Sequence, residues 1–386
     1  MVTGALICEY NPFHNGHKYM LDMMRLDGCD HIIAVMSGSF TQRGDVAVYS
    51  KFTRTEKALS GGADIVIELP AVWAVSSAQR FAKGGCDIIK GLQCVDRVYF
   101  GSECGDISVL KAAALATCDQ RVNEKVKVFM DNGDYYPVAL QKSVEEIYGS
   151  DYAEILSSPN NILGIEYIKA LMDTDIDVRT IKRTGVSHDS QSTTDTIASA
   201  SKIRELISTD TDFSCFVPED SKTSNPAFLE QGERALLLRL RDTDEATLKA
   251  TADVSEGLHN RILSVSREKN TIEDILSEVK TKRYTHSRLR RILICTLLGI
   301  KNSHYEMSVP YIRILGFTQK GAELIKSIHS TASLPLVINA AKDMNNLSQS
   351  AKEILNIDIK ATDLRTVFEE SPTPCGSDFT NGIIKV

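Results

Sequence analysis

Short β-rich runs alternate with amphipathic stretches over the first two hundred residues of this chain. Helical stretches separate the first three runs, and the second of these stretches ends at Gly61 and Gly62, a suitable helix stop. Strands that alternate with helices form parallel sheets with right-handed crossovers. The pattern predicts an α/β fold with a Rossmann-like, doubly wound parallel sheet. Its expected strands are Ala5 to Tyr10, His31 to Met36, Asp64 to Leu69, Arg97 to Gly101 and Asp177 to Lys182.

A polar stretch rich in Ser, Thr, Asp and Pro, from Thr209 to Gln231, is typical of a domain boundary. We therefore expect two domains, residues 1–210 and residues 211–386, the second mainly α-helical. Its expected helices are Glu233 to Arg241, Asp244 to Leu258, Thr271 to Lys282 and His286 to Leu298. The tail after Ser371 contains Pro, Ser and Gly, and we expect it to be mobile.

The formal net charge of the 386 residues is -7, so any contact with nucleic acid has to come from a local basic surface. No stretch has the unbroken apolar length of a transmembrane helix, and the N-terminus lacks a signal-peptide pattern, which favours a cytoplasmic protein. The nine cysteines form no Cys-x-x-Cys pair, and several lie in apolar runs. We expect buried, reduced thiols rather than zinc ligands or disulfides.

The first strand ends in a polar turn that holds His14 and His17, and a helix follows. One histidine in a turn would usually be an ordinary surface or hydrogen-bonded residue. Two imidazoles together at a helix N-terminus indicate an anion-binding site, because the backbone N–H groups and the helix dipole there already favour an anion. The stretch predicts a nucleotide phosphate site.

Short polar turns follow three of the other strands, at Ser37 to Ser39, Glu68 to Pro70 and Gly101 to Glu103. Each alone would be plain loop chemistry. Ligands of doubly wound sheets bind beyond the carboxyl ends of the strands, so the shared location of these turns argues for one site. No Gly-x-Gly-x-x-Gly follows the first strand, which argues against an ordinary dinucleotide-binding domain.

The tetrapeptide His14-Asn-Gly-His17, between a strand and a helix, resembles the signature of the HIGH-type nucleotidyltransferase superfamily. Further motifs follow in order along most of the chain. Together they resemble the tRNA(Met) cytidine acetate ligase family. The matching runs are Glu9 to His17, Met36 to Asp45, Ile67 to Pro70, Phe100 to Glu103, Ser158 to Gly164, Ile197 to Arg204 and Lys280 to Tyr284.

This resemblance implies an enzyme that uses ATP to activate acetate as acetyl-AMP, with release of pyrophosphate. The acetyl group would then pass to N4 of the wobble cytidine of elongator tRNA(Met), giving N4-acetylcytidine. His14 and His17 would be the catalytic residues and would donate to phosphate oxygens as negative charge develops. Mg²⁺ would arrive with ATP, held largely by phosphate oxygens and water, and no dedicated metal site is expected. No membrane and no protein partner are implied.

The resemblance also implies an ATP site made of the stretch around the two histidines and of positions further along the chain. Gly16, which has no side chain, would let the backbone approach a phosphate closely. The implied site comprises Ile7, Cys8, Glu9, Tyr10, Asn11, Pro12, Phe13, His14, Asn15, Gly16, His17, Lys18, Tyr19, Met20, Gly101, Asn160, Asn161, Arg183, Ser201 and Arg204.

The run Ser199 to Arg204 resembles the second superfamily signature, although Ala200 and Ser201 replace its usual Ser and Thr. Either this run is only an N-cap before an ordinary helix, expected from Ile203 to Ile207, or Ser201 and Arg204 contact the β- and γ-phosphates. Arg183 at a strand end is likewise either a solvated charge or a bidentate phosphate donor, and the resemblance favours the donor.

A polar cluster of Gln42, Arg43, Asp45 and Lys51 follows the second strand. A charged loop of this kind is usually exposed to solvent and binds no ligand. If it folds over the nucleotide, Arg43 or Lys51 could hold the acetate carboxylate.

One basic run interrupts the acidic chain, and it contains no acidic residue. Basic runs are commonly solvated helix faces. In an acidic protein, such a run beside Tyr284 is the candidate for RNA phosphate contacts and base stacking. Its cations are Lys280, Lys282, Arg283, Arg288, Arg290 and Arg291.

Two other functions stay open from the residues. One is an adenylyltransferase that acts on a small phosphorylated metabolite. The other is a noncatalytic tRNA-binding protein that keeps a nucleotide pocket only for structure.

Overall fold

The computed structural model describes residues 1–183, 196–218, 225–255, 257–281 and 284–386. Within them, one sheet runs in the order β5-β4-β1-β2-β3-β6-β7, and β8 pairs with β6. Neighbouring strands are parallel except β3 and β6, which are antiparallel. The strands are β1 Thr3–Cys8, β2 His31–Ser37, β3 Ile65–Leu69, β4 Arg97–Ser102, β5 Asp177–Lys182, β6 Ile312–Phe317, β7 Leu336–Val337 and β8 Ile384–Lys385. The predicted α/β sheet and its five expected strands are confirmed.

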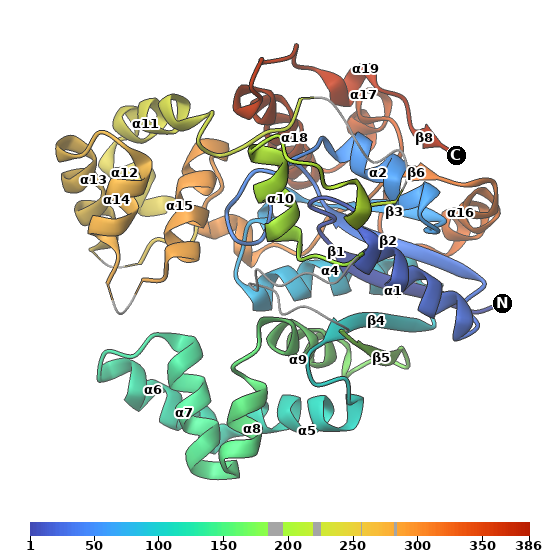
Figure 1. Cartoon of the computed structure of the whole chain (residues 1–386), viewed down its shortest axis with the longest axis horizontal. Coiled ribbons are helices and arrows are strands. Elements are labelled where there is room, and N and C mark those ends of the chain that lie inside the picture. The colour runs from blue at the N-terminus through green and yellow to red at the C-terminus, as the bar shows by residue number, and fades with distance from the viewer. Residues whose placement is uncertain (184–195, 219–224, 256, 282–283) are drawn as a thin grey trace.

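Helices cover both faces of this sheet (Figure 1). In the central strand β2, even-numbered residues pack in one apolar core with α1 and α2, and odd-numbered ones join a larger core with α4. The two-residue period of a strand requires this division. Helices before residue 210 are α1 Asn15–Leu26, α2 Lys51–Ser60, α3 Ala71–Ala74, α4 Ala78–Leu92, α5 Ile107–Cys118, α6 Gln120–Asp131, α7 Tyr136–Tyr148, α8 Ser150–Ile155, α9 Pro159–Leu171 and α10 Ala200–Ser208.

Beyond residue 210, five helices form a lobe beside the sheet, and others pack around the sheet itself (Figure 1). The lobe is α11 Glu233–Asp242, α12 Glu245–Ala250, α13 Leu258–Glu268, α14 Ile272–Val279 and α15 His286–Leu298. The others are α16 Gln319–Thr331, α17 Ala340–Asp343, α18 Gln349–Arg365 and α19 Ser377–Thr380, with short 3₁₀ turns at Ser214–Phe216, Asn302–Glu306, Met344–Asn346 and Thr366–Phe368. Because β6, β7 and β8 also come from this half, the sheet is not confined to residues 1–210.

The single helix expected from Asp244 to Leu258 is wrong, because α12 ends at Ala250. Thr251 forms a bridge with Lys301 instead of continuing the helix, and Asp253 has a positive φ of 65°. The helical spacing of apolar residues cannot reveal such a break, because α12 and the next helix, which begins at Leu258, bury their apolar faces in the same core.

The mobile tail expected after Ser371 is also wrong, because the segment is tied to the core. Asp378 in α19 is buried, and its Oδ1 lies 2.8 Å from Lys51 Nζ and 2.6 Å from an Arg313 nitrogen. The last strand, β8, then pairs with β6. The ion pairs of one buried carboxylate, Asp378, hold the tail in place, although its composition is typical of a mobile segment.

Three of the nine cysteines, Cys118, Cys215 and Cys375, are exposed, which differs from the burial expected of all of them. They lie at a helix end, in a 3₁₀ turn and in the tail rather than in apolar runs. Among the helices that the structure describes, none combines the length and the apolar character needed to cross a lipid bilayer.

Asp358 joins α18 to the sheet by accepting hydrogen bonds from the Ala71 N–H at 2.7 Å and the Tyr311 hydroxyl at 2.5 Å. Burial, helped by the charge of Glu68, raises the pKa of Asp358 to about 7 from its ordinary 3.8. Between these values the folded protein holds a proton that the unfolded chain releases. The stability from this group is therefore present at low pH and declines as pH rises from about 4 to about 7.

Replacing Asp358 by Asn, which keeps an acceptor for the Ala71 N–H, should remove that decline. We expect the unfolding free energy of Asp358→Asn, relative to the unchanged protein, to be higher at pH 7.5 than at pH 5. Urea unfolding at the two pH values measures the difference. The same relative stability at both would contradict the assignment.

Candidate active site

The two predicted histidines lie side by side at the N-terminus of α1. Their ring centroids are 3.7 Å apart and the ring planes are inclined by 26°. His14 Nδ1 accepts from the Gly16 N–H at 3.1 Å, and His17 Nδ1 accepts from the His14 N–H at 3.3 Å. An imidazole whose Nδ1 accepts carries its proton, in the neutral form, on Nε2. Each ring can therefore donate through Nε2 at the positive end of a helix.

The turn that carries these rings is held by hydrogen bonds from the loop and helix after β2. Arg54 of α2 is buried, and one of its nitrogens donates to the carbonyls of Glu9 at 2.6 Å and Ser37 at 3.0 Å. Asn11 Oδ1 accepts from the Val48 N–H at 2.8 Å. The ends of β1 and β2 are thus tied together, so the imidazoles are positioned before any ligand arrives.

Apolar rings complete the support. Tyr10 packs edge-on against Phe13 at 4.9 Å and against His17 at 4.8 Å between centroids, and both Tyr10 and Phe13 are buried. Phe13 also contacts Gly61, where an added Cβ would come within 2.3 Å of the ring. Tyr10, Pro12 and Phe13 of the predicted stretch therefore form the floor of the turn rather than its rim.

Arg204 reaches the same turn from α10. One of its nitrogens donates to the Asn11 carbonyl at 2.7 Å, and the other donates to Ser201 Oγ at 3.3 Å. Burial lowers the pKa of Arg204, against the attraction of Asp45 and Glu9. The helix start also has the ordinary cap, since Ser199 Oγ accepts from the Lys202 N–H at 3.1 Å. The structure thus brings the two signatures together, and the phosphate contacts of Ser201 and Arg204 stay a prediction.

Gly101, the last residue but one of β4, has Arg183 and Met20 as neighbours. A Cβ added to Gly101 would lie 3.2 Å from Arg183 Cγ and 3.4 Å from Met20 Cε. The Arg183 N–H donates to the Ser102 carbonyl at 2.9 Å, so the backbone of Arg183 is aligned with β4. These three predicted positions lie together, although Met20 and Gly101 are 81 positions apart in the chain and Gly101 and Arg183 are 82 positions apart.

Asn160 and Asn161, at the start of α9, hold the loop that follows β4. Asn161 is buried, and its Oδ1 accepts from the N–H groups of Glu103 at 3.0 Å and Cys104 at 3.2 Å. Asn160 Nδ2 donates to Glu103 Oε1 at 2.6 Å. In this structure both side chains shape a loop at the edge of the predicted site, and their contact with ATP stays a prediction.

Residues near the two ends of the predicted stretch make contacts within the sheet or on the surface of α1. Ile7 packs beneath Gly85 of α4, and Cys8 Sγ contacts the Val35 carbonyl at 3.7 Å, so both side chains belong to the sheet. Lys18 pairs with Asp22 at 2.9 Å on the exposed side of α1. Two further residues of the stretch, Asn15 and Tyr19, are partly buried and exposed, respectively.

Lys51 is not available as an acetate ligand. Its Nζ is fully buried and lies 2.8 Å from both Glu68 Oε1 and Asp378 Oδ1. Of the two cations suggested for acetate, Arg43 remains. The structure also adds Arg54, which sequence analysis missed. Its spacing of four residues from buried Ala58 on α2 was the signal, since both lie on the face packed against the sheet.

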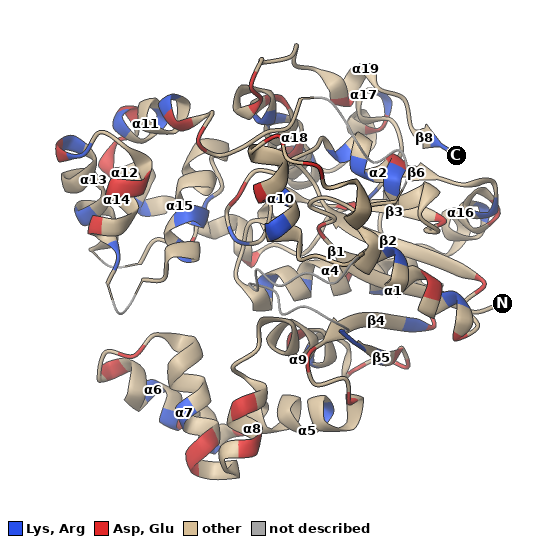
Figure 2. Cartoon of the chain, in the orientation of Figure 1, with Lys and Arg blue, Asp and Glu red and all other residues tan. Residues whose placement is uncertain are grey.

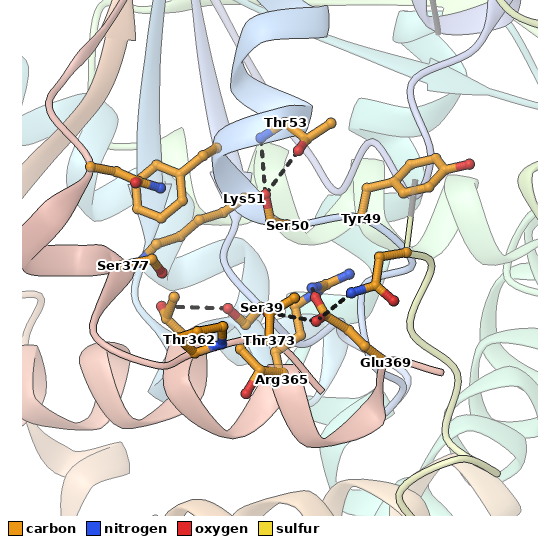
Figure 3. Close-up of a pocket in the computed structure, with 15 residues that line it drawn as sticks. Ser39, Tyr49, Ser50, Lys51, Thr53, Thr362, Arg365, Glu369, Thr373 and Ser377 are labelled. Atoms are coloured by element: carbon orange, nitrogen blue, oxygen red, sulfur yellow. Dashed lines mark hydrogen bonds and ion pairs between the residues drawn. The ribbon is translucent and has the colours of Figure 1, made fainter. Parts of the chain in front are cut away.

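A cavity of about 270 Å³ lies apart from the histidines, between α2 and α18 (Figure 3). Arg365 on its floor pairs with Glu369 at 2.6 Å and donates to the Val48 carbonyl at 2.7 Å. The N–H of the same Val48 donates to Asn11, so one segment of backbone separates the cavity from the histidine turn. The charged side chains that line the cavity, Lys51, Arg365 and Glu369, are paired within the protein.

The structure divides the predicted basic run. Arg288 donates to the Asp253 carbonyl at 2.8 Å, and Arg291 Nε donates to Asp253 Oδ2 at 2.8 Å, so both serve the fold. Lys280 is exposed. Arg290 is partly buried, and its Nε has no hydrogen-bond partner among the described residues. Lys282 and Arg283 lie outside the described residues. Figure 2 shows blue cations on α11, α13 and α15 with acidic residues among them.

A family model described as HIGH Nucleotidyl Transferase matches residues 1–377. Together with the paired imidazoles at the end of β1, this match makes the chain a nucleotidyltransferase of the HIGH class. Relatives named tRNA(Met) cytidine acetate ligase cover nearly its whole length. The protein from Acetivibrio thermocellus is 37% identical over an alignment of 409 positions that covers 98% of this chain and 99% of that protein. The one from Thermoanaerobacter sp. is 37% identical over an alignment of 401 positions that covers 99% of both chains. This chain belongs to the tRNA(Met) cytidine acetate ligase family.

Solved structures agree with this assignment. The crystal structure of apo Thermotoga maritima TmcAL matches with a TM-score of 0.94 and 32% identity over 100% of both chains. The same protein bound with alpha-thio ATP matches with a TM-score of 0.92. The family and the fold expected from the motifs are confirmed.

Proposed function

We propose that this chain is an ATP-dependent ligase that activates acetate as acetyl-AMP and acetylates N4 of the wobble cytidine of elongator tRNA(Met). The observation that carries the proposal is the stacked pair of His14 and His17 at the start of α1, beyond the end of β1. The shared name of the full-length relatives, and the nucleotide analogue bound by the Thermotoga maritima protein, support it.

In the first step, an acetate oxygen attacks the α-phosphorus of ATP, and pyrophosphate leaves with the electrons of the broken P–O bond. Negative charge grows on the phosphate oxygens, and the Nε2–H groups of His14 and His17 donate to those oxygens. Arg204 and Arg183 hold the departing phosphates as bidentate donors. The remaining positions of the implied site, from Ile7 to Met20 with Gly101, Asn160, Asn161 and Ser201, shape the pocket.

In the second step, N4 of cytidine attacks the acyl carbon of acetyl-AMP. The bond from that carbon to the phosphate oxygen breaks, AMP leaves with the electron pair, and N4 releases one proton. The lone pair of N4 is delocalised into the pyrimidine ring, so free acetate does not react and a mixed anhydride is needed. The RNA base has to leave its loop to reach the strand ends.

Mg²⁺ is proposed to arrive with ATP, held by phosphate oxygens and water. Among the described residues, no three His, Cys, Asp or Glu side chains gather as a metal site of their own. We propose that residues 1–210 carry the ATP chemistry and that residues 211–386 carry the RNA contacts, through the lobe of α11 to α15. Because tRNA and ATP are its substrates, the cytoplasm is the proposed place of action.

The direct test is to incubate the purified protein with ATP, isotopically labelled acetate and tRNA(Met), and then to analyse the nucleosides by mass spectrometry. Labelled N4-acetylcytidine is expected only when all three substrates are present. Unmodified cytidine, with ATP and tRNA both bound, would refute the proposal. An adenylyltransferase of small metabolites is not favoured, because the similarity to the ligases extends through the helical lobe.

Lys280 is the described cation of the basic run best placed for RNA, because it is exposed. Arg290 is partly buried, its Nε is enclosed within the protein, and one of its terminal nitrogens lies 3.9 Å from Glu273. Replacing Lys280 by Ala should weaken tRNA binding and lower the slope of log K against log salt by about 0.7 to 0.9, the loss of one phosphate contact. Filter binding across a salt series measures both. Lys111→Ala, at an exposed position of α5 in another part of the molecule, is the matched control and should change neither.

A further inference from the structure

The loop between β2 and α2 lies between the turn that carries His14 and His17, called the nucleotide turn below, and the helical lobe of α11 to α15. It closes on itself, because Phe40 and Val46 form a bridge and the Thr41 N–H donates to the Asp45 carbonyl at 2.9 Å. The Gly44 N–H donates back to the Thr41 carbonyl at 3.0 Å. We call residues 40–46 the bridging loop.

On one side the bridging loop is fastened to the residue that precedes the histidine turn. The backbone N–H of Gln42 donates to Glu9 Oε1 at 2.7 Å. The side-chain amide of Gln42 donates to the Ser76 carbonyl at 2.9 Å, next to the start of α4. The loop thus has two fixed points on the catalytic half of the molecule.

On the other side the loop touches the backbone of α15, the helix that carries Arg290. Gly44 has a φ of +75°, and a Cβ added there would lie 2.4 Å from the Arg291 nitrogen and 2.5 Å from the Arg290 carbonyl carbon. Backbone atoms of a helix cannot rotate away as a side chain does. Only glycine allows this approach.

The charged groups around the bridging loop connect the same two parts of the molecule. Burial raises the pKa of Asp45 in the bridging loop, and the positive charges of Arg204 and Arg290 oppose that rise. Asp45 is therefore close enough to interact electrostatically with Arg204 of the predicted nucleotide site and with Arg290 of α15. The loop links the two sites electrostatically as well as sterically.

We propose that the bridging loop sets the distance between α15 and the nucleotide turn, so that Gly44 and Gln42 are positioning residues for transfer of the acetyl group to RNA. The inference rests on the proposed function. Transfer needs the RNA amine at the acyl carbon, and a displacement of about 1 Å can lower such a rate about 100-fold. Acetyl-AMP formation involves only ATP and acetate, so it does not depend on the position of α15.

The test measures two products in one reaction that contains ATP, labelled acetate and tRNA(Met). Gly44→Ala should release AMP within about twofold of the unchanged protein, while N4-acetylcytidine formed per AMP falls at least tenfold. Acetyl-AMP that is not transferred is hydrolysed, which accounts for the AMP. Gly28→Ala is the matched control, because Gly28 also has a positive φ, +88°, but nothing lies within 4 Å of its added Cβ. It should keep the yield unchanged.

Gln42→Ala supplies a second variant without a steric clash, and it removes only the bond to the Ser76 carbonyl. It should lower the yield per AMP in the same direction but by less. Unchanged yield in both variants, or an equal fall of AMP and acetylcytidine in a Gly44→Ala protein that melts normally, would overturn the inference. If the unchanged protein forms no acetylcytidine, the proposed function fails instead, so the two failures are distinguishable.

Discussion

Replacing His14 or His17 by Ala is expected to lower the rate of acetyl-AMP formation by about 100- to 1000-fold, the usual effect of losing one oriented donor in a transition state. Nδ1 of each ring accepts from a backbone N–H, which leaves the neutral ring its proton on Nε2 for the proposed donation to phosphate. Alanine removes that donor while the helix N-terminus stays in place. Acetate-dependent exchange of labelled pyrophosphate into ATP, with tRNA present, measures the loss.

Both histidines also cap α1, so a structural effect has to be separated from a catalytic one. A lost cap costs about 1 kcal/mol of stability. Ser348→Ala is the matched control, because Ser348 caps α18 by accepting from the Ala351 N–H at 3.2 Å, far along the chain from the turn. It should lower the melting temperature by a similar amount with the rate unchanged. Histidine variants that keep nearly full exchange activity would show that the rings only support the helix.

Replacing Lys51 by Met should lower the free energy of unfolding by about 3 to 5 kcal/mol, the range for breaking a buried ion pair. Lys51 Nζ lies between Glu68 and Asp378, and Arg313 contacts the same two carboxylates at 3.0 and 2.6 Å. Although burial alone would raise it, the pKa of Asp378 is held below its ordinary value by Lys51 and Arg313. Methionine fills the space but leaves two buried carboxylates with one cation.

Lys83→Met is the control for this second variant, because Lys83 pairs with Asp87 at 2.5 Å on an exposed helix face. Such surface pairs contribute about 0.3 to 0.5 kcal/mol. Urea unfolding of both variants gives the comparison. We also expect Lys51→Met to loosen the tail, so limited proteolysis should cut it after Ser371 sooner than in Lys83→Met. Equal stability of the two variants would contradict the role given to the buried charges.

The candidate site could be predicted from the sequence where its residues are contiguous in the chain. His14, Gly16 and His17 lie within one turn, so their spacing alone places both imidazoles at a helix start. Arg204 could be added only through its resemblance to a second signature, and its hydrogen bond to the Asn11 carbonyl links it to the first. Arg54 was missed, because its spacing from Ala58 indicates only the buried face of a helix, and an arginine that donates only to backbone carbonyls belongs to no motif.

The sequence by itself determined the parallel strands, the turn at the end of β1 and the family, because each depends on residues close together in the chain. Only the tertiary structure decided that β6 joins β3 in the antiparallel sense, that Asp378 anchors the tail beside Lys51, and that Gly44 touches α15. These contacts join segments hundreds of residues apart. Their partners are chosen by packing and by the need to neutralise buried charge, and neither leaves a local pattern.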